Sequence, residues 1–310
     1  MNPTMELQEA TSVSLKSILF ATDFSVASEK AFEHASALAR RHDCKFSVVH
    51  VIPQVRAALV PALEEDLQWQ HARQAMDILA GRDELKHTRH QLLLRRGSVW
   101  NALSNLIQEE AVDLLVVGTH GRGGLEKLIV GSIAEEMVRL ATCAVMTVGP
   151  NAAVPSPLSG EFHRILFATD FSPASEKALP YATFFAQQSG AKLMLLHVVQ
   201  GAPLPSGELG STFYDEATTA KWESETRAVT LERLKELLSA EATTLCKPNY
   251  EVAFGIPTTE ILYSAEKHQS DLIVIGAKRV VSAAASAHIS WAASHELICH
   301  AMCPVLTIRE

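Results

Sequence analysis

An internal repeat constrains the fold of this chain more than any other feature of its sequence. The stretch Ile-Leu-Phe-Ala-Thr-Asp-Phe-Ser at residues 18–25 returns unchanged at residues 165–172, and Ala-Ser-Glu-Lys-Ala follows in both copies. Two further pairs of segments match in the same order: 45–51 with 192–198, and 113–118 with 271–276. A period of roughly 150 residues indicates duplicated domains rather than a solenoid of short repeats.

The length of the chain also suggests two domains, because 310 residues are about twice the roughly 150 residues of a typical domain. Residues 151–160 are rich in Pro, Ser and Ala and poor in large apolar side chains, as in a linker. We therefore expect one domain at residues 15–150 and a second at 161–310. With 47% apolar and 20% charged residues, each copy can bury a core.

The charge, the apolar runs and the cysteines of the chain indicate where the protein acts and which partners it does not bind. The net charge of -8 argues against a general surface for nucleic acid or anionic membranes, since such surfaces need clustered Lys and Arg. Residues 1–14 lack the pattern of a signal peptide, and no run approaches the roughly 18 to 20 apolar residues that cross a bilayer. The five cysteines form no CxxC pair, which fits a reducing compartment. We expect a cytoplasmic protein.

Short apolar runs alternate with segments of helical period in the first copy, a pattern typical of βαβ units around a parallel sheet. The expected strands are 18–21, 46–51, 91–94, 114–117 and 144–148. The expected helices include 27–41, 99–110 and 133–140. In the second copy, Ser172 followed by Pro173 predicts a helix that begins with a hydroxyl N-cap and Pro in its first turn. Five strands per copy with right-handed crossovers follow.

A glycine-rich segment follows the fourth expected strand. It contains Gly118, Gly121 and the pair Gly131-Ser132, which stands directly before the helical run 133–140. We expect Gly118 and Gly121 to take positive φ and let the backbone approach a phosphate, and Gly131-Ser132 to present free, unpaired N–H groups at a helix start. Such a helix end carries partial positive charge. Arg122 or Lys127 would add a compensating charge.

The spacing Gly, two residues, Gly, nine residues, Gly-Ser resembles the ATP-binding pattern of the universal stress protein family. The resemblance also rests on the Asp that closes the first strand and the His-Val that closes the second, and it covers nearly the whole chain twice. It implies an α/β fold of two tandem Rossmann-like domains, each a five-stranded parallel sheet of order 3-2-1-4-5. Asp23 and Gly118 would then end neighbouring strands at a topological switch point, where such sheets bind ligands.

The resemblance also implies a set of binding residues for ATP, with or without Mg²⁺. Adenine and ribose would be surrounded by Ala21, Thr22, Asp23 and Val51. The phosphates would be held by Gly118, Gly121, Gly131 and Ser132, with Val117, His120, Arg122 and Ile133 beside them. Asp23 would accept a ribose hydroxyl and is the carboxylate available to a Mg²⁺ ion on the triphosphate.

Structural interpretations compete with these functional ones. Asp23 and Gly118 alone also suit a turn and a cap. His50 and His197 are expected to be structural imidazoles, and Cys299 and Cys303 to be core side chains rather than metal ligands. The segment 64–86 is expected to be a solvated helix with three apolar side chains inward. These are Leu67, Ile78 and Leu79.

Binding is better supported by the sequence than turnover. It contains no Walker A lysine, no spacing typical of a nucleophile with its base, and no paired carboxylates dedicated to a metal. We expect a stress-response protein whose interactions with protein partners depend on bound ATP. The alternatives are a slow ATPase or phosphotransfer enzyme, and a scaffold with a vestigial site.

The second copy departs from the glycine pattern. Arg279 replaces the second glycine, and the third is replaced by Ile289-Ser290 or, with two extra residues in the alignment, by Trp291-Ala292. We expect that this copy does not bind ATP as the first does. The resemblance to the family also implies that the fifth strands, 144–148 and 305–308, pair within the chain as a pseudo-dimer. Both are short apolar segments that need cover, and exposed strand edges invite pairing. Further assembly into homo-oligomers stays open.

Overall fold

A computed structural model describes residues 13–53, 62–119, 131–153, 160–201, 216–277 and 291–310. Each copy alternates strands with helices, as predicted. The elements of the first copy are β1 Ser17–Ala21, α1 Val26–Arg41, β2 Lys45–Ile52, α2 Ala62–Ala80, η1 Asp83–Leu85, β3 His90–Arg96, α3 Val99–Glu109, β4 Leu114–Gly118, α4 Ser132–Leu140 and β5 Ala144–Val148. Those of the second are β6 Arg164–Ala168, α5 Pro173–Ser189, β7 Lys192–Val199, α6 Glu216–Glu236, α7 Ala240–Cys246, β8 Asn249–Phe254, α8 Pro257–Lys267, β9 Leu272–Ala277, α9 Trp291–His300 and β10 Val305–Arg309.

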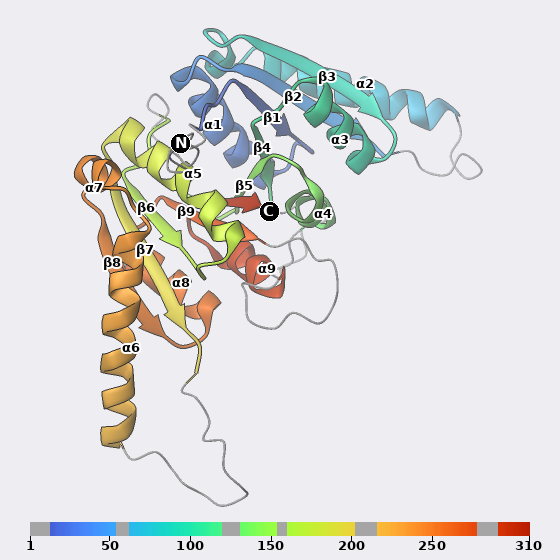
Figure 1. Ribbon diagram of the computed structural model, residues 1–310. Helices are drawn as coiled ribbons and strands as arrows, with labels where there is room; N and C mark the ends of the chain where they lie inside the picture. The colour runs from blue at the N-terminus through green and yellow to red at the C-terminus, as the bar shows by residue number, and fades with distance from the viewer. Residues whose placement is uncertain (1–12, 54–61, 120–130, 154–159, 202–215, 278–290) are drawn as a thin grey trace, which may run out of the picture.

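The strands form one continuous ten-stranded sheet with the order β3-β2-β1-β4-β5-β10-β9-β6-β7-β8 (Figure 1). Within each copy the paired strands run parallel, and each half reads 3-2-1-4-5 from its outer edge to the centre. This order places β1 beside β4 with connections that leave in opposite directions. It therefore creates a switch point in each half, where ligands of such sheets bind.

The two halves meet through their fifth strands. β10 pairs with β5 in antiparallel register, with Val305 opposite Thr147 and Thr307 opposite Val145. The hydroxyl of Thr147 donates a hydrogen bond of 3.2 Å to the carbonyl oxygen of Val305. The predicted pairing within one chain is therefore confirmed, and it covers an edge of each half that would otherwise present unpaired backbone groups.

Helix α1 also binds the segment that joins the two copies. The ammonium of Lys30 donates to the carbonyl oxygen of Ala152 at 2.9 Å, and Ala152 is fully buried. At the far end of α1, the guanidinium of Arg41 forms an ion pair with Glu161. The linker residue Ala152 therefore packs on the first domain, and the end of α1 contacts the first residue of the second domain.

The starts of the two equivalent helices confirm the cap prediction. The Ser25 hydroxyl accepts the N–H of Ser28 at the start of α1, and the Ser172 hydroxyl accepts the N–H of Ser175 at the start of α5. Pro173 is the first residue of α5, where its missing N–H costs no helical hydrogen bond. These caps fix where each helix leaves the strand before it.

The expected inward face of α2 was wrong in two of its three residues. Leu67 and Ile78 are 45% and 70% exposed, whereas Leu79 is buried. In the part of this helix whose side chains are described, residues 66–80, the other buried residues are Ala72 and Met76. Ala72, Met76 and Leu79 are four and three residues apart, so they share one face of the helix. Ile78 points about 100° away from Leu79 around the helix axis.

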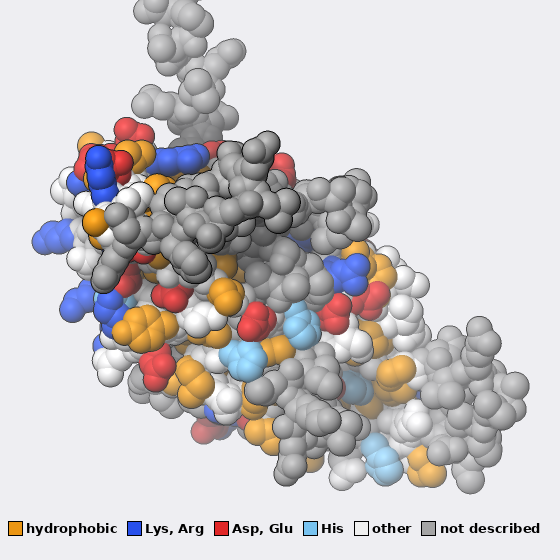
Figure 2. Space-filling model, turned by 90° about the horizontal axis from the view of Figure 1, so that it is seen from below, with side chains coloured by type: hydrophobic (Ala, Val, Ile, Leu, Met, Phe, Trp, Pro, Cys, Tyr) orange, Lys and Arg blue, Asp and Glu red, His pale blue; other side chains and the backbone are white. Residues whose placement is uncertain are grey.

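Helix length and the distribution of surface charge are two further features of the described residues. No helix in the residues that the structure describes is long and apolar enough to cross a membrane. Figure 2 shows one face of the molecule, on which acidic and basic side chains are interspersed with apolar ones.

Candidate functional site

A cavity of about 590 Å³ opens at the switch point of the first copy, at the ends of β1, β2 and β4. It brings together nine of the twelve predicted site residues, which come from four separate stretches of the chain. These are Ala21, Thr22, Asp23, Val51, Val117, Gly118, Gly131, Ser132 and Ile133. The other three, His120, Gly121 and Arg122, lie outside the described residues.

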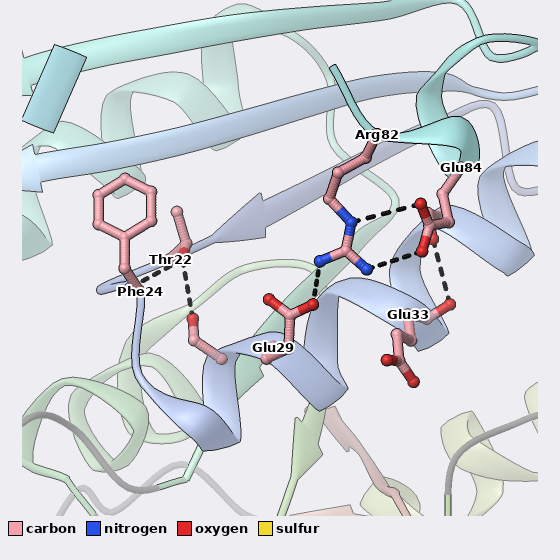
Figure 3. A network of polar contacts seen from close by, with 8 residues as sticks. Thr22, Phe24, Glu29, Glu33, Arg82 and Glu84 are labelled. Atoms are coloured by element: carbon pink, nitrogen blue, oxygen red, sulfur yellow. Dashed lines mark hydrogen bonds and ion pairs between the residues drawn. The ribbon is translucent and has the colours of Figure 1, made fainter. Parts of the chain in front are cut away.

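The turn between β1 and α1 forms one wall of the cavity. It is held by hydrogen bonds between residues that are close in sequence. The Asp23 carboxylate accepts the N–H of Ser25 at 3.0 Å, and the Asp23 N–H donates to the Ser28 hydroxyl at 3.3 Å. The Thr22 hydroxyl accepts the N–H of Phe24 and the Ser28 hydroxyl, both at 3.0 Å (Figure 3). Asp23 therefore serves as a turn residue and, at the same time, places a carboxylate on the cavity wall.

The same turn contains a residue with a strained backbone and is held in position by a histidine. Phe24 has φ of 61°, which is unusual for a bulky residue and costs about 1–3 kcal/mol. Its ring centroid lies 4.6 Å from that of His50, and Nδ1 of His50 donates to the carbonyl oxygen of Thr22 at 2.7 Å. The predicted structural role of His50 is confirmed, although its side chain also lines the cavity.

Figure 3 also shows a second polar group, further along α1. Arg82 contacts the carboxylates of Glu29 and Glu84, and its guanidinium carbon lies 4.5 Å from the ring centroid of Phe32. The described lining of the cavity includes none of these four residues. We interpret this group as an attachment of η1 to α1.

Gly118 has a different reason to be glycine from the one that the sequence suggested. It does not take positive φ, and a Cβ at this position would lie 2.8 Å from the carbonyl carbon of Ala27 and the nitrogen of Ser28. The end of β4 thus needs glycine because the first turn of α1 packs directly on it. Gly276 is in the same situation, with a Cβ position 2.3 Å from the backbone of Ala174. This explains why the second copy keeps that glycine.

The N-terminus of α4 forms the opposite wall of the cavity. Gly131 is the N-cap, and its φ of -57° is ordinary for any residue. Its N–H donates to the carbonyl oxygen of Thr119 at 2.6 Å, so the expected unpaired N–H at Gly131 was wrong. The next residues, Ser132 to Ala134, line the cavity with the first N–H groups of the helix, which have no acceptor within it. This arrangement suits an anion.

Helices α2 and α3 supply a part of the cavity wall that the sequence did not predict. Gln68, His71 and Ala72 lie on α2, and Val99 begins α3; all four line the cavity. Gln68 and His71 are exposed polar residues three positions apart, so they share one helix face. Their spacing is visible in the sequence, but only the packing of α2 against the sheet shows which face meets the cavity.

A smaller cavity of about 280 Å³ lies at the corresponding place in the second copy. Its lining includes Asp170 and Val198, the counterparts of Asp23 and Val51, together with His197. Nδ1 of His197 donates to the carbonyl oxygen of Thr169 at 2.7 Å, and burial lowers the pKa of this imidazole. The structural role predicted for His197 is confirmed.

The cysteines and histidines of α9 form no metal site among the described residues, where no cluster of three or more ligand side chains occurs. Cys299 and Cys303 are buried, and burial raises the pKa of Cys303 to about 12. Both behave as small core side chains, as predicted.

Comparison with known proteins gives consistent matches. The model of the universal stress protein family matches residues 14–149 and again 161–309. Universal stress protein A homolog 1 of Coxiella burnetii is 33% identical over 141 residues, which are 43% of this chain and 95% of that protein. A crystal structure of a universal stress protein from Archaeoglobus fulgidus has a TM-score of 0.66 at 19% identity, covering 94% of this chain and 98% of that one. A Pseudomonas aeruginosa protein described as functionally unknown, PA1789, has a TM-score of 0.58 at 16% identity, covering 95% and 92%.

Proposed function

Because the chain belongs to the universal stress protein family, we propose that its first copy binds ATP and that bound ATP controls interactions with protein partners. One observation carries this proposal. A single cavity joins the strand ends that carry Asp23 and Val51 to the N-terminus of α4. An apolar wall with a carboxylate suits a nucleoside, and a helix N-terminus suits phosphates.

The dimensions and chemistry of the cavity fit such a ligand. Its volume of about 590 Å³ lies within the roughly 300–1,000 Å³ of small-molecule sites. The base would lie against Ala21 and Val51, the ribose hydroxyls at Asp23, and the phosphates at Ser132. We propose that the predicted loop residues His120, Gly121 and Arg122 complete the phosphate site.

Magnesium would arrive with the triphosphate rather than occupy a site of its own. Among the described residues no cluster of three ligand side chains is present, and Asp23 supplies one carboxylate to the cavity wall. Mg²⁺ is commonly bound by one or two carboxylates together with substrate phosphates.

We propose binding rather than rapid turnover as the activity of this site. The sequence contains no Walker A lysine and no spacing typical of a nucleophile with its base. In the structure, Asp23 and His50 hold the turn in place through the Ser25 N–H and the carbonyl oxygen of Thr22. We further propose that the protein acts in the cytoplasm and that its domains span residues 15–150 and 161–310.

Two measurements test this proposal. In the first, protein purified without added nucleotide is heat-denatured, and the released nucleotides are separated by chromatography. In the second, ATP is titrated into the nucleotide-free chain by calorimetry. We expect ATP in the extract or saturable ATP binding. A chain that neither releases nor binds ATP would instead be a scaffold with a vestigial site. Release of phosphate from bound ATP over hours would identify a slow hydrolase.

A further inference from the structure

One face of α2 passes from the core to the cavity of the first copy. Ala72, Met76 and Leu79 are buried on this face, and α2 runs along β2 and β3 (Figure 1). Gln68 lies four residues before Ala72, so it continues the same face by one turn. Both Gln68 and Ala72 line the cavity, together with the end of β2. Gln68 therefore occupies a core-facing position at which the cavity takes the place of the sheet.

The position of Gln68 is fixed by contacts of the residues around it. The ring of Trp69, the next residue, is covered by the guanidinium of Arg96, whose carbon lies 4.6 Å from the ring centroid. Arg96 is the last residue of β3, and Ala72 is buried one turn further along α2. A side chain on an anchored helix is held in a better-defined position than one on a loop. This part of α2 can therefore orient a ligand.

The polar side chains of α2 differ in one respect from those of the facing wall. Asp23 and His50 hold the turn between β1 and α1 through hydrogen bonds. Gln68 and His71 also line the cavity, but neither makes a hydrogen bond with another residue that the structure describes. Helix α2 thus supplies the cavity with hydrogen-bonding groups that no contact within the described chain requires.

The chemistry of these two side chains points to a purine base. A glutamine amide presents a donor and an acceptor side by side, so it can bind N7 and the N6 amino group of adenine together. Guanine presents two acceptors at the same edge, O6 and N7, and the amide can bind only one of them. The donor and acceptor of a neutral imidazole point in different directions, so His71 cannot bind both atoms of this edge. Gln68 is the residue suited to recognise adenine.

We propose that Gln68 selects adenine over guanine in the first cavity, with the base held between this amide and Val51. The inference rests on the proposed function, because that function places the base of ATP against Val51. It goes beyond that function by assigning the choice of base to a residue of α2, which lies outside the glycine pattern and outside the strand ends.

Calorimetric titration of ATP, GTP and 7-deaza-ATP into the intact chain tests this assignment. In 7-deaza-ATP a carbon replaces N7, so the bond from the amide is lost. We expect wild type to bind ATP about tenfold or more tighter than GTP, and 7-deaza-ATP several-fold more weakly than ATP. Gln68→Leu should weaken ATP binding about tenfold and GTP binding less, and should bind ATP and 7-deaza-ATP equally. The control is Gln74→Leu, an exposed position of α2 outside the described lining of either cavity.

Gln68→Glu provides a second variant. It keeps an oxygen that accepts the N6 amino group but loses the donor to N7, so it too should bind ATP and 7-deaza-ATP equally. An unfolding midpoint equal to that of wild type verifies that each variant is folded, as expected for an exposed side chain.

Two results would overturn the inference and leave the proposed function standing. One is an ATP affinity of Gln68→Leu equal to that of wild type. The other is the same loss on replacing N7 in wild type and in both variants, which would place the N7 contact elsewhere. A wild-type chain that binds neither ATP nor GTP would refute the proposed function, and the inference with it.

Discussion

Nε2 of His34 on α1 donates a hydrogen bond of 3.0 Å to the carbonyl oxygen of Ala153 in the segment that joins the two copies. The imidazole stacks on Phe162, with an interplanar angle of 12°. Its burial, together with the nearby charge of Lys30, lowers the pKa of His34 to about 4. A neutral histidine therefore fastens the linker to the first domain.

This histidine predicts a pH dependence of stability. Between the ordinary pKa of about 6.5 and the folded value of about 4, the unfolded chain binds a proton at His34 that the folded chain does not. The free energy of unfolding should therefore fall as pH decreases through this window, by about 3 kcal/mol from this group. Urea denaturation of wild type and His34→Gln at pH 7 and pH 4.5 measures the difference. An equal loss of stability in both proteins would contradict this role.

Gly118→Ala should destabilise the first domain, because its Cβ would lie 2.8 Å from backbone atoms of Ala27 and Ser28. We expect a loss of about 1–3 kcal/mol, as in other overpacked cores. Gly149→Ala is the matched control, since its Cβ would meet the Ala301 oxygen at 3.6 Å and the Thr119 hydroxyl at 3.8 Å, both ordinary contact distances. Denaturation midpoints of the two variants provide the comparison. If Gly118→Ala were as stable as the control, the close packing of α1 on β4 would be disproved.

Gly131→Ala should weaken ATP binding and cost about 1 kcal/mol or less of stability, because alanine is a poorer N-cap than glycine. The φ of -57° suits alanine, so the substitution adds only a Cβ next to the proposed phosphate position. We expect about tenfold lower affinity, or about 1.4 kcal/mol. Calorimetry on Gly131→Ala and on Gly121→Ala measures the effect, with Gly81→Ala at the end of α2 as control. Unchanged affinity in both variants would remove the phosphate site from this loop.

The pairing of β5 with β10 predicts the behaviour of an isolated first domain. A fragment of residues 14–150 would expose the edge of β5, including the backbone of Val145 and Thr147 that now pairs with β10. We expect it to dimerise or aggregate, whereas the whole chain has this edge covered. Light scattering after size-exclusion chromatography measures the mass. A stable monomeric fragment would show that the edge needs no cover.

The strands could be predicted from the sequence because both faces of this sheet are covered by helices. Buried parallel strands read as continuous apolar runs, and each of the five runs identified in the first copy falls within a strand. The inward face of α2 could not be predicted in the same way. Its apolar residues include the exposed Leu67 and Ile78, so its apolar pattern alone does not identify Ala72 and Met76 as the inward ones.

One part of the candidate site could likewise be predicted from the sequence, whereas another part required the structure. Asp23 and Gly118 could be brought together from the strand order, since both end neighbouring strands. The reason for glycine at position 118 required the structure, because the contact with Ala27 joins elements far apart in the sequence. The wall from α2 required it too, since Gln68 and His71 are ordinary polar helix residues until α2 is placed over the cavity.

The number of ATP molecules bound per chain distinguishes a protein with one ATP site from a protein with two. Calorimetric titration of ATP into the intact chain should give one ATP per chain, bound in the first copy, because Arg279 replaces the second glycine of the pattern in the second copy and the third glycine is absent. Binding should weaken in Gly131→Ala and persist in Gly81→Ala. Two ATP per chain, or a site whose affinity is unaffected by substitutions at Gly121 and Gly131, would contradict the account.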